Sequence, residues 1–347
     1  MDKVTEAQLK LVPEMSELLK KRYRILQAIM LEQPIGRRTV SESVKLTERE
    51  VRKETDLMRE QQLIEMKTAG MIVTDLGEEV LSSLMEFIHE ISGLGQMEKQ
   101  LQQALGISKV IIVPQNSDDM PAVKYQIGKE AAKLLEAQFA KFKKIAVTGG
   151  STMAAIAKGL NMEKTDKKLQ FIAARGGLGE DVLHQANTIA SAFAGQAGGS
   201  FKTLYLPDHL SQEAFETMMK EPMIKDMMDL YNQTEVVVHG IGNAEEMAKR
   251  RNSSQEEVEK IRSGGAVSEA FGYYFDKDGK VVYRIRTAGI QLEQVQRAPA
   301  ILAVAGGRSK GKAILSYFKN APERTVLVTD EGAAREIIET TEKQEEL

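Results

Sequence analysis

The spacing of apolar residues divides the chain into a largely helical first third and a longer part in which helices alternate with strands. In residues 14–31, apolar side chains recur every three or four positions, which predicts an amphipathic helix. A short second helix is expected over residues 37–44. Thr47 and Glu50 then have capping-box spacing, so a third helix should begin there and continue to about Gln61.

Two strand-like runs follow the third helix, at residues 63–67 and 71–74. Three helices and a hairpin in this order are typical of a winged helix-turn-helix, whose third helix enters the DNA major groove. We therefore predict a DNA-binding domain over residues 1–77. An ordinary solvated surface is the alternative interpretation of its charges, above all near the start of the second helix. The basic side chains expected to contact bases or phosphates are Arg37, Arg38, Arg49, Arg52, Lys53 and Arg59.

The distribution of charge favours a nucleic-acid partner for this domain. The whole chain has a formal net charge of −3. Residues 20–67 hold twelve Lys and Arg against eight Asp and Glu, which leaves the rest of the chain with a net charge of −7. A basic segment joined to an acidic body indicates double-stranded operator DNA as the partner of that segment.

Residues 78–105 continue the helical spacing, with an interruption at Gly93-Leu94-Gly95. One side of this connector is too apolar to face water, so it must pack on its own body or on another subunit. We expect it to pair subunits in a homodimer or homotetramer, because twofold-related DNA-binding domains match twofold-related half-sites. A helix that docks on its own body remains the alternative.

Residues 106–347 repeat one unit, in which a short apolar run is followed by a polar or glycine-bearing turn and a helix. Apolar runs that alternate with helices predict an α/β domain with a doubly wound, mainly parallel sheet. An Asp-Gly pair before residues 281–285 adds an inserted hairpin. The apolar runs lie at residues 110–113, 145–147, 171–174, 203–206, 236–238, 301–304 and 326–328.

Glycines, hydroxyls and basic residues gather where these apolar runs end. Ligands of parallel sheets bind at the carboxyl ends of the strands, and phosphate favours a glycine turn that leads into a helix N-terminus. Arginine adds a planar fork and lysine a point charge, while a carboxylate can orient sugar hydroxyls. Helix capping and structural ion pairs are the alternative roles of single residues. The candidate ligands are Gly149, Gly150, Ser151, Thr152, Arg175, Arg250, Arg251, Glu269 and Lys310.

Several function classes are disfavoured by what the chain lacks. It contains neither Gly-x-Gly-x-x-Gly nor a P-loop, so nucleotide hydrolysis is not expected. The acids Glu180, Asp181 and Glu269 and the lone His239 form no recognisable acid–base set, yet a sugar-phosphate isomerase or deaminase with an accessory N-terminal domain remains the alternative function. With no cysteine and no apolar run of ~20 residues, we expect a cytoplasmic protein without metal or cofactor.

Several motifs resemble the SorC-type family of sugar-binding transcriptional regulators, which is related to the DeoR repressors. The most specific are Ala174-Arg175-Gly176-Gly177-Leu178-Gly179-Glu180-Asp181-Val182 and Glu269-Ala270-Phe271-Gly272-Tyr273-Tyr274-Phe275. Val147-Thr148-Gly149-Gly150-Ser151-Thr152 and Gln185-Ala186-Asn187 add to the likeness, which covers nearly the whole chain.

The resemblance implies a sensor domain similar to the sugar-phosphate isomerase and deaminase fold. It also implies a repressor of a glycolytic operon, with fructose 1,6-bisphosphate as the inducer. Residues 149–152 would then cradle one phosphate, and relatives often have threonine where this chain has Ser151. The residues that would complete the pocket, as the resemblance implies, are Arg175, Gln185, Arg250, Glu269 and Lys310.

Overall fold

The computed structural model describes residues 3–160, 168–177, 182–206 and 211–345. The chain folds into two compact units, each with its own core. The first comprises residues 1–96 and 119–122, and the second comprises residues 97–118 and 123–347. No helix among the described residues is both long enough and apolar enough to cross a membrane.

The first unit begins with helices and ends with a small hairpin and a further helix. The predicted three helices and antiparallel hairpin are confirmed as elements, whereas a short helix before them was not predicted. A second connector helix follows a break at Ser92–Gly93, and most of its residues belong to the second unit. The elements are α1 (Lys3–Leu11), α2 (Pro13–Glu32), α3 (Arg37–Val44), α4 (Glu48–Glu60), β1 (Ile64–Lys67), β2 (Gly70–Val73), α5 (Asp75–Ile91) and α6 (Leu94–Leu105).

Helix α4 begins and packs as its sequence predicts. The Thr47 hydroxyl accepts from the Glu50 N–H, and the Glu50 carboxylate accepts from the Thr47 N–H, which completes the capping box. Val51, Thr55 and Met58 turn into the core of the unit. The arrangement fixes one face of α4 against the unit and leaves the opposite face to solvent.

Glu54 also turns inward, which the apolar pattern did not reveal. Its side chain is 2% exposed, and its carboxylate pairs with Lys21 at 2.7 Å and with Arg22 at 2.8 Å. Burial alone would raise the pKa of Glu54, but hydrogen bonds and charges from these two cations outweigh burial and lower it. The pairs tie α2 to α4.

The second unit is built on a seven-stranded parallel sheet, which confirms the predicted mainly parallel architecture. Its strand order is β3-β13-β12-β7-β4-β5-β6, and every pair is parallel. The strands are β3 (Lys109–Val113), β4 (Lys144–Val147), β5 (Gln170–Ala173), β6 (Ser200–Lys202), β7 (Val236–Gly240), β12 (Ala300–Val304) and β13 (Thr325–Asp330).

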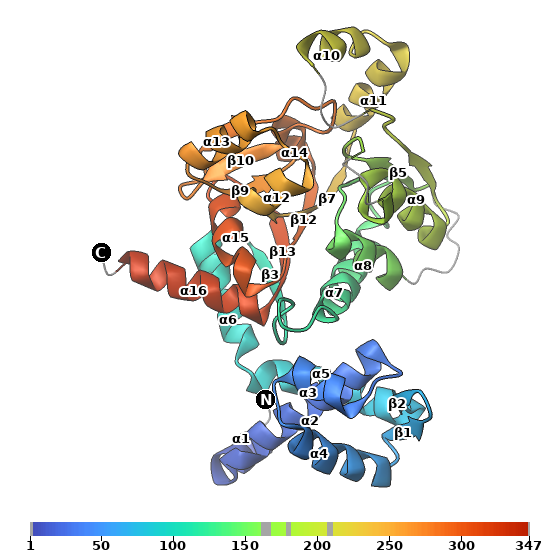
Figure 1. The fold of residues 1–347 in the computed structure, drawn as a ribbon, viewed down its shortest axis with the longest axis vertical. Helices are drawn as coiled ribbons and strands as arrows, with labels where there is room; N and C mark the ends of the chain where they lie inside the picture. Colours follow the sequence, from blue (N-terminus) through green and yellow to red (C-terminus); the bar gives the residue numbers. More distant parts are fainter. Residues whose placement is uncertain (1–2, 161–167, 178–181, 207–210, 346–347) are drawn as a thin grey trace. The chain divides into compact units, whose positions relative to one another are not determined.

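Helices cover both faces of this sheet (Figure 1). Right-handed crossovers place helices on one face while the chain moves in one direction along the sheet, and on the other face once it turns back. Accordingly, α7 (Val123–Gln138), α8 (Ser151–Gly159) and α9 (Ala186–Ala197) pack together, as do α15 (Gly311–Phe318) and α16 (Glu331–Glu345). Two further helices, α10 (Gln212–Met218) and α11 (Pro222–Asn232), precede β7.

The predicted strand over residues 203–206 is wrong, because the edge strand β6 lies earlier, at Ser200–Lys202. All three β6 residues are exposed, so the strand carries no apolar signature. Leu204 and Leu206 are buried without being strand residues. The Asn187 side chain donates to the Leu204 carbonyl and accepts from its N–H, both at 3.0 Å, and so replaces a strand partner.

An insertion between β7 and β12 forms a four-stranded antiparallel sheet with the order β11-β10-β9-β8. The predicted hairpin is confirmed, with Gly279 in its turn at φ = 80°. Helix α15 packs on β9 and so joins the two sheets. The inserted elements are β8 (Gly242–Asn243), α12 (Ala244–Arg250), α13 (Gln255–Ser263), β9 (Ala266–Ala270), β10 (Tyr273–Asp276), β11 (Val281–Arg284) and α14 (Leu292–Arg297).

The chain reverses its direction along the sheet between the adjacent strands β4 and β7. From β4 it continues to β5 and β6, and from β7 it continues the opposite way to β12 and β13. The connections therefore leave the carboxyl ends of β4 and β7 on opposite faces. Such a switch point leaves a crevice, where ligands of open α/β sheets bind.

His239 on β7 is a fully buried polar residue in this core, with 0% exposure. Its Nδ1 lies 3.0 Å from the Gly240 carbonyl, which can only accept, so Nδ1 carries the proton. Its Nε2 then accepts from the Tyr317 hydroxyl at 3.2 Å. Burial lowers the pKa of His239 to about 4, which keeps the ring neutral.

We expect Glu54→Gln to destabilise the first unit by about 1–3 kcal/mol at pH 7, because it breaks the carboxylate's charge-assisted hydrogen bonds. A carboxyl with a lowered folded pKa stabilises above its unfolded pKa of about 4.3, and this stability is lost as the pH falls through the folded pKa. The difference between wild type and variant should therefore shrink from pH 7 to pH 3 in scanning calorimetry of the full chain. The exposed Glu60→Gln is the matched control, and equal melting of both variants would contradict the assignment.

We expect the second unit to lose stability as the pH falls from about 6.5 to 4, because the unfolded His239 takes up a proton that the folded ring does not. At 1.36 kcal/mol per pKa unit, this group contributes about 3 kcal/mol over that range. His239→Gln removes the titration. The unfolding free energy of wild type minus that of the variant, measured in urea, should therefore decrease over that pH range. Parallel pH curves for the two proteins would show that the ring titrates normally.

Candidate functional site

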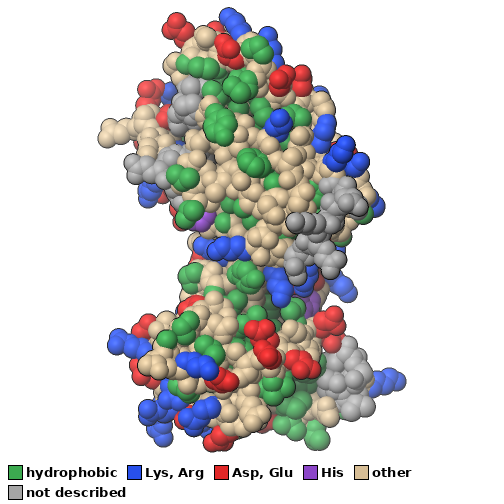
Figure 2. Space-filling view, turned by 90° about the vertical axis from the view of Figure 1, so that its right-hand side faces the viewer, with side chains coloured by type: hydrophobic (Ala, Val, Ile, Leu, Met, Phe, Trp, Pro, Cys, Tyr) green, Lys and Arg blue, Asp and Glu red, His purple; other side chains and the backbone are tan. Residues whose placement is uncertain are grey.

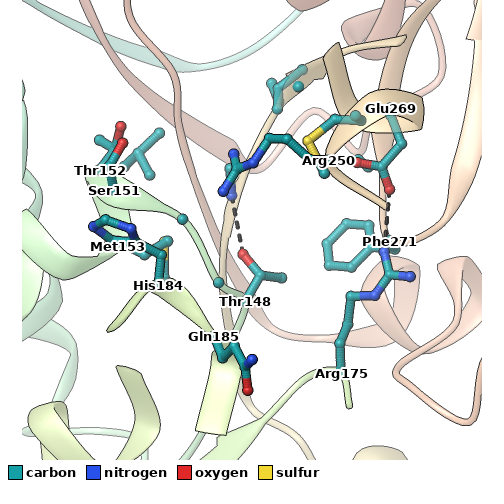
Figure 3. Close-up of a pocket in the computed structure, with 18 of the residues that line it drawn as sticks. Thr148, Ser151, Thr152, Met153, Arg175, His184, Gln185, Arg250, Glu269 and Phe271 are labelled. Atoms are coloured by element: carbon teal, nitrogen blue, oxygen red, sulfur yellow. Dashed lines mark hydrogen bonds and ion pairs between the residues drawn. The ribbon is translucent and has the colours of Figure 1, made fainter. Parts of the chain in front are cut away.

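A cavity of about 410 Å³ lies at the switch point of the parallel sheet (Figure 3). Its walls come from the turns after β4, β5 and β7, from the start of α9, from α12 and from the β9–β10 turn. All ten residues predicted as effector ligands line it, although their role as ligands stays a prediction. They are Gly149, Gly150, Ser151, Thr152, Arg175, Gln185, Arg250, Arg251, Glu269 and Lys310.

The N-terminus of α8 forms one wall of the cavity. Gly150 is its N-cap residue at φ = 126°, and no side chain caps the first turn. The first N–H groups of a helix have no acceptor within the helix, and the helix dipole adds partial positive charge there. Ser151, Thr152 and Met153 in this first turn all line the cavity. This wall is therefore suited to an anion such as phosphate.

The turn that leads into α8 is packed too tightly for a side chain at Gly149. A Cβ atom there would lie 2.4 Å from the His184 carbonyl oxygen. That same carbonyl accepts from the Gly150 N–H at 2.8 Å. The short 3₁₀ helix Val182–His184 is thereby held against the turn, and Gln185 directly after it is placed on the cavity wall.

Thr148 joins the two turns of the switch point and was not among the predicted site residues. Its hydroxyl accepts from the Gly240 N–H at 3.2 Å, which connects the ends of β4 and β7. It also lines the cavity. The sequence did offer a signal for Thr148, because it directly follows a buried strand and directly precedes the two glycines that were predicted as ligands.

A buried carboxylate holds the wall that faces α8. Glu269 Oε1 accepts from Arg251 Nη2 at 2.6 Å, from Arg175 Nη1 at 3.2 Å and from the Gly272 N–H at 2.6 Å. The two arginines are only 5% and 4% exposed. Figure 3 shows the pair of Arg175 and Glu269 across from Ser151 and Thr152. Two guanidinium groups and one carboxylate leave this wall with a net positive charge.

The β9–β10 turn supplies an apolar surface to the same wall. Ala270 pairs with Tyr273, and the two residues between them, Phe271 and Gly272, have φ values of 57° and 87°. These values identify a type I′ turn. The ring centroids of Phe271 and His239 lie 4.7 Å apart. A phenylalanine in the left-handed region costs ~1–2 kcal/mol, which its burial against His239 offsets.

Lys310 approaches the cavity from the turn after β12. Burial lowers its pKa, and repulsion from Lys124 and Arg250 adds to this effect, while Glu246 and Asp118 act in the opposite direction. Asp330 at the end of β13 holds this turn in place, because its carboxylate accepts from the Gly307 N–H at 2.7 Å. Lys310 is therefore a half-buried cation within the electrostatic influence of two other cations, an arrangement that suits an anionic ligand.

Two of the acid–base candidates that the sequence offered, His239 and Glu269, are described by the structure, and both are engaged within the protein. Both ring nitrogens of His239 are engaged, so it has no free position for a substrate proton. Glu269 is held by two arginines. The other two acids considered, Glu180 and Asp181, lie outside the described residues. Within the described part of the chain, no group of three metal-binding side chains is found.

The predicted DNA contacts fall into two groups in the first unit. Arg49, Arg52 and Lys53 are exposed on α4. Arg59 lies near Asp56, and Arg38 pairs with Glu42 on the surface. Figure 2 shows basic side chains standing out from this unit among acidic ones.

Arg37 is less available than its sequence position indicated. Its Nε donates to the Thr55 hydroxyl at 3.2 Å, and its Nη2 pairs with Asp56 at 2.6 Å. These contacts join α3 to α4. Arg37 therefore has a structural role in the described unit, and its contact with DNA stays a prediction.

Comparisons with known proteins agree with both halves of the chain. Residues 18–88 match the CggR N-terminal DNA binding domain, and residues 89–339 match the sugar-binding domain family Sugar-bind. The central glycolytic genes regulator of Bacillus subtilis (strain 168) is 43% identical over 338 residues, which cover 97% of this chain and 99% of that protein.

Solved structures give the same result. A SorC family transcriptional regulator from Enterococcus faecalis is 41% identical, with a TM-score of 0.65 over 70% of this chain and 99% of that one. The full-length sorbitol operon regulator SorC from Klebsiella pneumoniae, at 16% identity, shares the fold with a TM-score of 0.64 over 90% of this chain and 97% of that one. These relatives are transcriptional regulators, not enzymes. The chain therefore belongs to the SorC family of sugar-binding transcriptional regulators and groups with the central glycolytic genes regulators.

Proposed function

We propose that this protein represses a glycolytic operon and that fructose 1,6-bisphosphate relieves the repression. The observation that carries this proposal is the distribution of anion-binding groups around one cavity. The α8 N-terminus lies on one side, and Arg175, Arg250 and Lys310 approach from other elements. A ligand with a phosphate at each end would satisfy both groups at once.

The sugar between the phosphates has suitable partners in the same cavity. Gln185 and Thr148 carry hydrogen-bonding side chains on its wall, and Phe271 supplies an apolar surface for carbon atoms. Glu269, although held by two arginines, lines the cavity and has acceptor capacity beyond those bonds. We infer that the body shares the isomerase and deaminase fold but serves as a sensor.

We infer that the first unit is a winged helix-turn-helix with α4 as its recognition helix and β1–β2 as its wing. Arg49, Arg52 and Lys53 on the exposed face of α4 would contact base edges or phosphates in the major groove. Arg38 and Arg59 would contact backbone phosphates. The functional division would be a DNA-binding domain over residues 1–77, a connector over 78–105 that pairs subunits, and an effector domain over 106–347.

Effector and operator would act on each other by linkage. If the bisphosphate weakens operator binding, the DNA-bound form must bind the bisphosphate more weakly by the same factor. A homodimer or homotetramer would present two recognition helices to two half-sites, so a change in the separation of these helices would suffice to release DNA.

We expect fructose 1,6-bisphosphate to raise the melting temperature of the purified full-length protein more than hexose monophosphates, triose phosphates or inorganic phosphate do. A ligand that binds the folded state stabilises it by about 2.7 kcal/mol at a concentration 100-fold above its Kd. A thermal-shift panel of these compounds measures this directly. Arg175→Ala should abolish the shift; a panel in which no sugar phosphate raises the melting temperature would refute the sensor proposal.

We expect Arg52→Ala and Lys53→Ala to weaken operator binding by about tenfold each and to leave the bisphosphate-induced thermal shift unchanged. Fluorescence anisotropy at several salt concentrations, on operator DNA selected by the wild-type protein, would also show a shallower salt dependence where a phosphate contact is lost. Lys133→Ala, on the surface of the effector domain, is the control for net charge. Normal affinity and salt slope in both α4 variants would remove α4 as the recognition helix.

A further inference from the structure

We propose that Lys124 is a third cation, with Arg250 and Lys310, at the cavity end that receives one of the two phosphates. It would thereby raise the preference of the site for a bisphosphate over a monophosphate. The inference rests on the proposed function, because it assumes a phosphorylated sugar in this cavity. Lys124 is not a lining residue of the cavity, so its effect would come from the charge that it carries beside the turn of Lys310, on which α7 packs.

The position of Lys124 follows from the packing of the first turn of α7. Lys124 and Ile127 are three residues apart and share a face of the helix. A Cβ atom at Gly306 would lie 2.4 Å from Ile127 Cδ1, so this face packs on the turn that leads to Lys310. The side chain of Lys124 therefore lies on the α7 face directed toward the Lys310 turn.

A second contact holds the segment before α7 against the same turn. The Asp118 carboxylate accepts from the Ser309 N–H at 2.8 Å and from the Ser309 hydroxyl at 3.1 Å. Gly307 must lack a side chain here, because a Cβ atom would lie 2.3 Å from Asp118 Oδ1. Asp118, before Lys124 in the chain, and Ile127, after it, both contact this turn. The backbone of Lys124 is therefore held close to the turn.

The charges at this place are not balanced within the protein. Across the residues that the structure describes, Lys124, Arg250 and Lys310 form no ion pair. After burial, Lys124 is the strongest influence on the pKa of Lys310, which it lowers by repulsion. Glu246 and Asp118 offset part of this repulsion, which leaves three cations against two acids among the charges that act on Lys310 and Lys310 itself. Like charges held together in this way favour an external anion.

The size of the effect follows from Coulomb's law for partly exposed charges. A unit charge several ångströms from a phosphate in a medium of high effective dielectric changes affinity by about five- to tenfold. Because Lys124 is half-buried rather than enclosed, salt should screen much of the effect.

Isothermal titration calorimetry of the full chain tests the assignment with fructose 1,6-bisphosphate, fructose 1-phosphate and fructose 6-phosphate. Lys124→Gln should lower bisphosphate affinity about five- to tenfold at low salt and preserve affinity for at least one monophosphate. Lys124→Arg, which keeps the charge, should bind the bisphosphate like wild type. Lys133→Gln, an exposed lysine on the same helix, is the matched control for net charge.

Two results would overturn the role of Lys124. One is unchanged bisphosphate affinity in Lys124→Gln; the other is an equal loss for all three ligands, which would indicate a structural defect. These results are separate from failure of the proposed function. If the wild-type protein bound none of the three sugar phosphates, both the sensor proposal and this inference would fall, whereas wild-type binding with an unaffected Lys124→Gln would remove the inference alone.

Discussion

The shape of the cavity depends on the three hydrogen bonds that Glu269 Oε1 accepts. Arg175 follows β5 of the parallel sheet, whereas Arg251 and Gly272 belong to the insertion after β7, so one oxygen joins two separate sheets. Without this carboxylate, two guanidinium groups would lie almost out of contact with water with no opposing charge, which is strongly unfavourable. The carboxylate makes it possible to bury two arginines in the cavity wall, and the net charge of that wall is still positive. A phosphate can complete the neutralisation.

Topology explains why the remaining groups converge. The chain reverses direction between β4 and β7, and Thr148 hydrogen-bonds across this reversal to Gly240. The crevice opens where the α8 N-terminus points, and the insertion that leaves β7 closes over it with α12 and the β9–β10 turn. The anion-binding elements therefore come from both directions of the sheet, and none of them alone forms more than a weak anion site.

Sequence reasoning succeeded where local patterns dictate structure and failed where distant contacts do. Buried parallel strands are continuous apolar runs, so their carboxyl ends, and with them the glycine turns and Arg175, were predictable. The edge strand β6 is exposed and lacks that pattern, while the apolar residues after it are buried through Asn187. Glu54 and the type I′ turn at Phe271 were missed for the same reason: a buried carboxylate needs partners on another helix, and a left-handed phenylalanine needs the ring of His239. The shared edge of the parallel strands brings the glycine turns, Arg175 and Lys310 to one cavity, whereas Arg250, Arg251 and Glu269 reach it from the insertion after β7, which the strand pattern alone does not place.

The distribution of charge also separates the DNA partner of the first unit from the anionic effector that we propose for the second. The body of the chain is acidic on balance, and residues 20–67 are basic. DNA, whose charge is spread over a long surface, is attracted to the basic residues 20–67 and repelled by the acidic body. A small sugar phosphate responds to the local field inside the cavity, where arginines and lysines outnumber the acids that face them. His239 has no free ring nitrogen and Glu269 is held by arginines, so neither of these two described residues is placed to move a proton on a bound sugar phosphate.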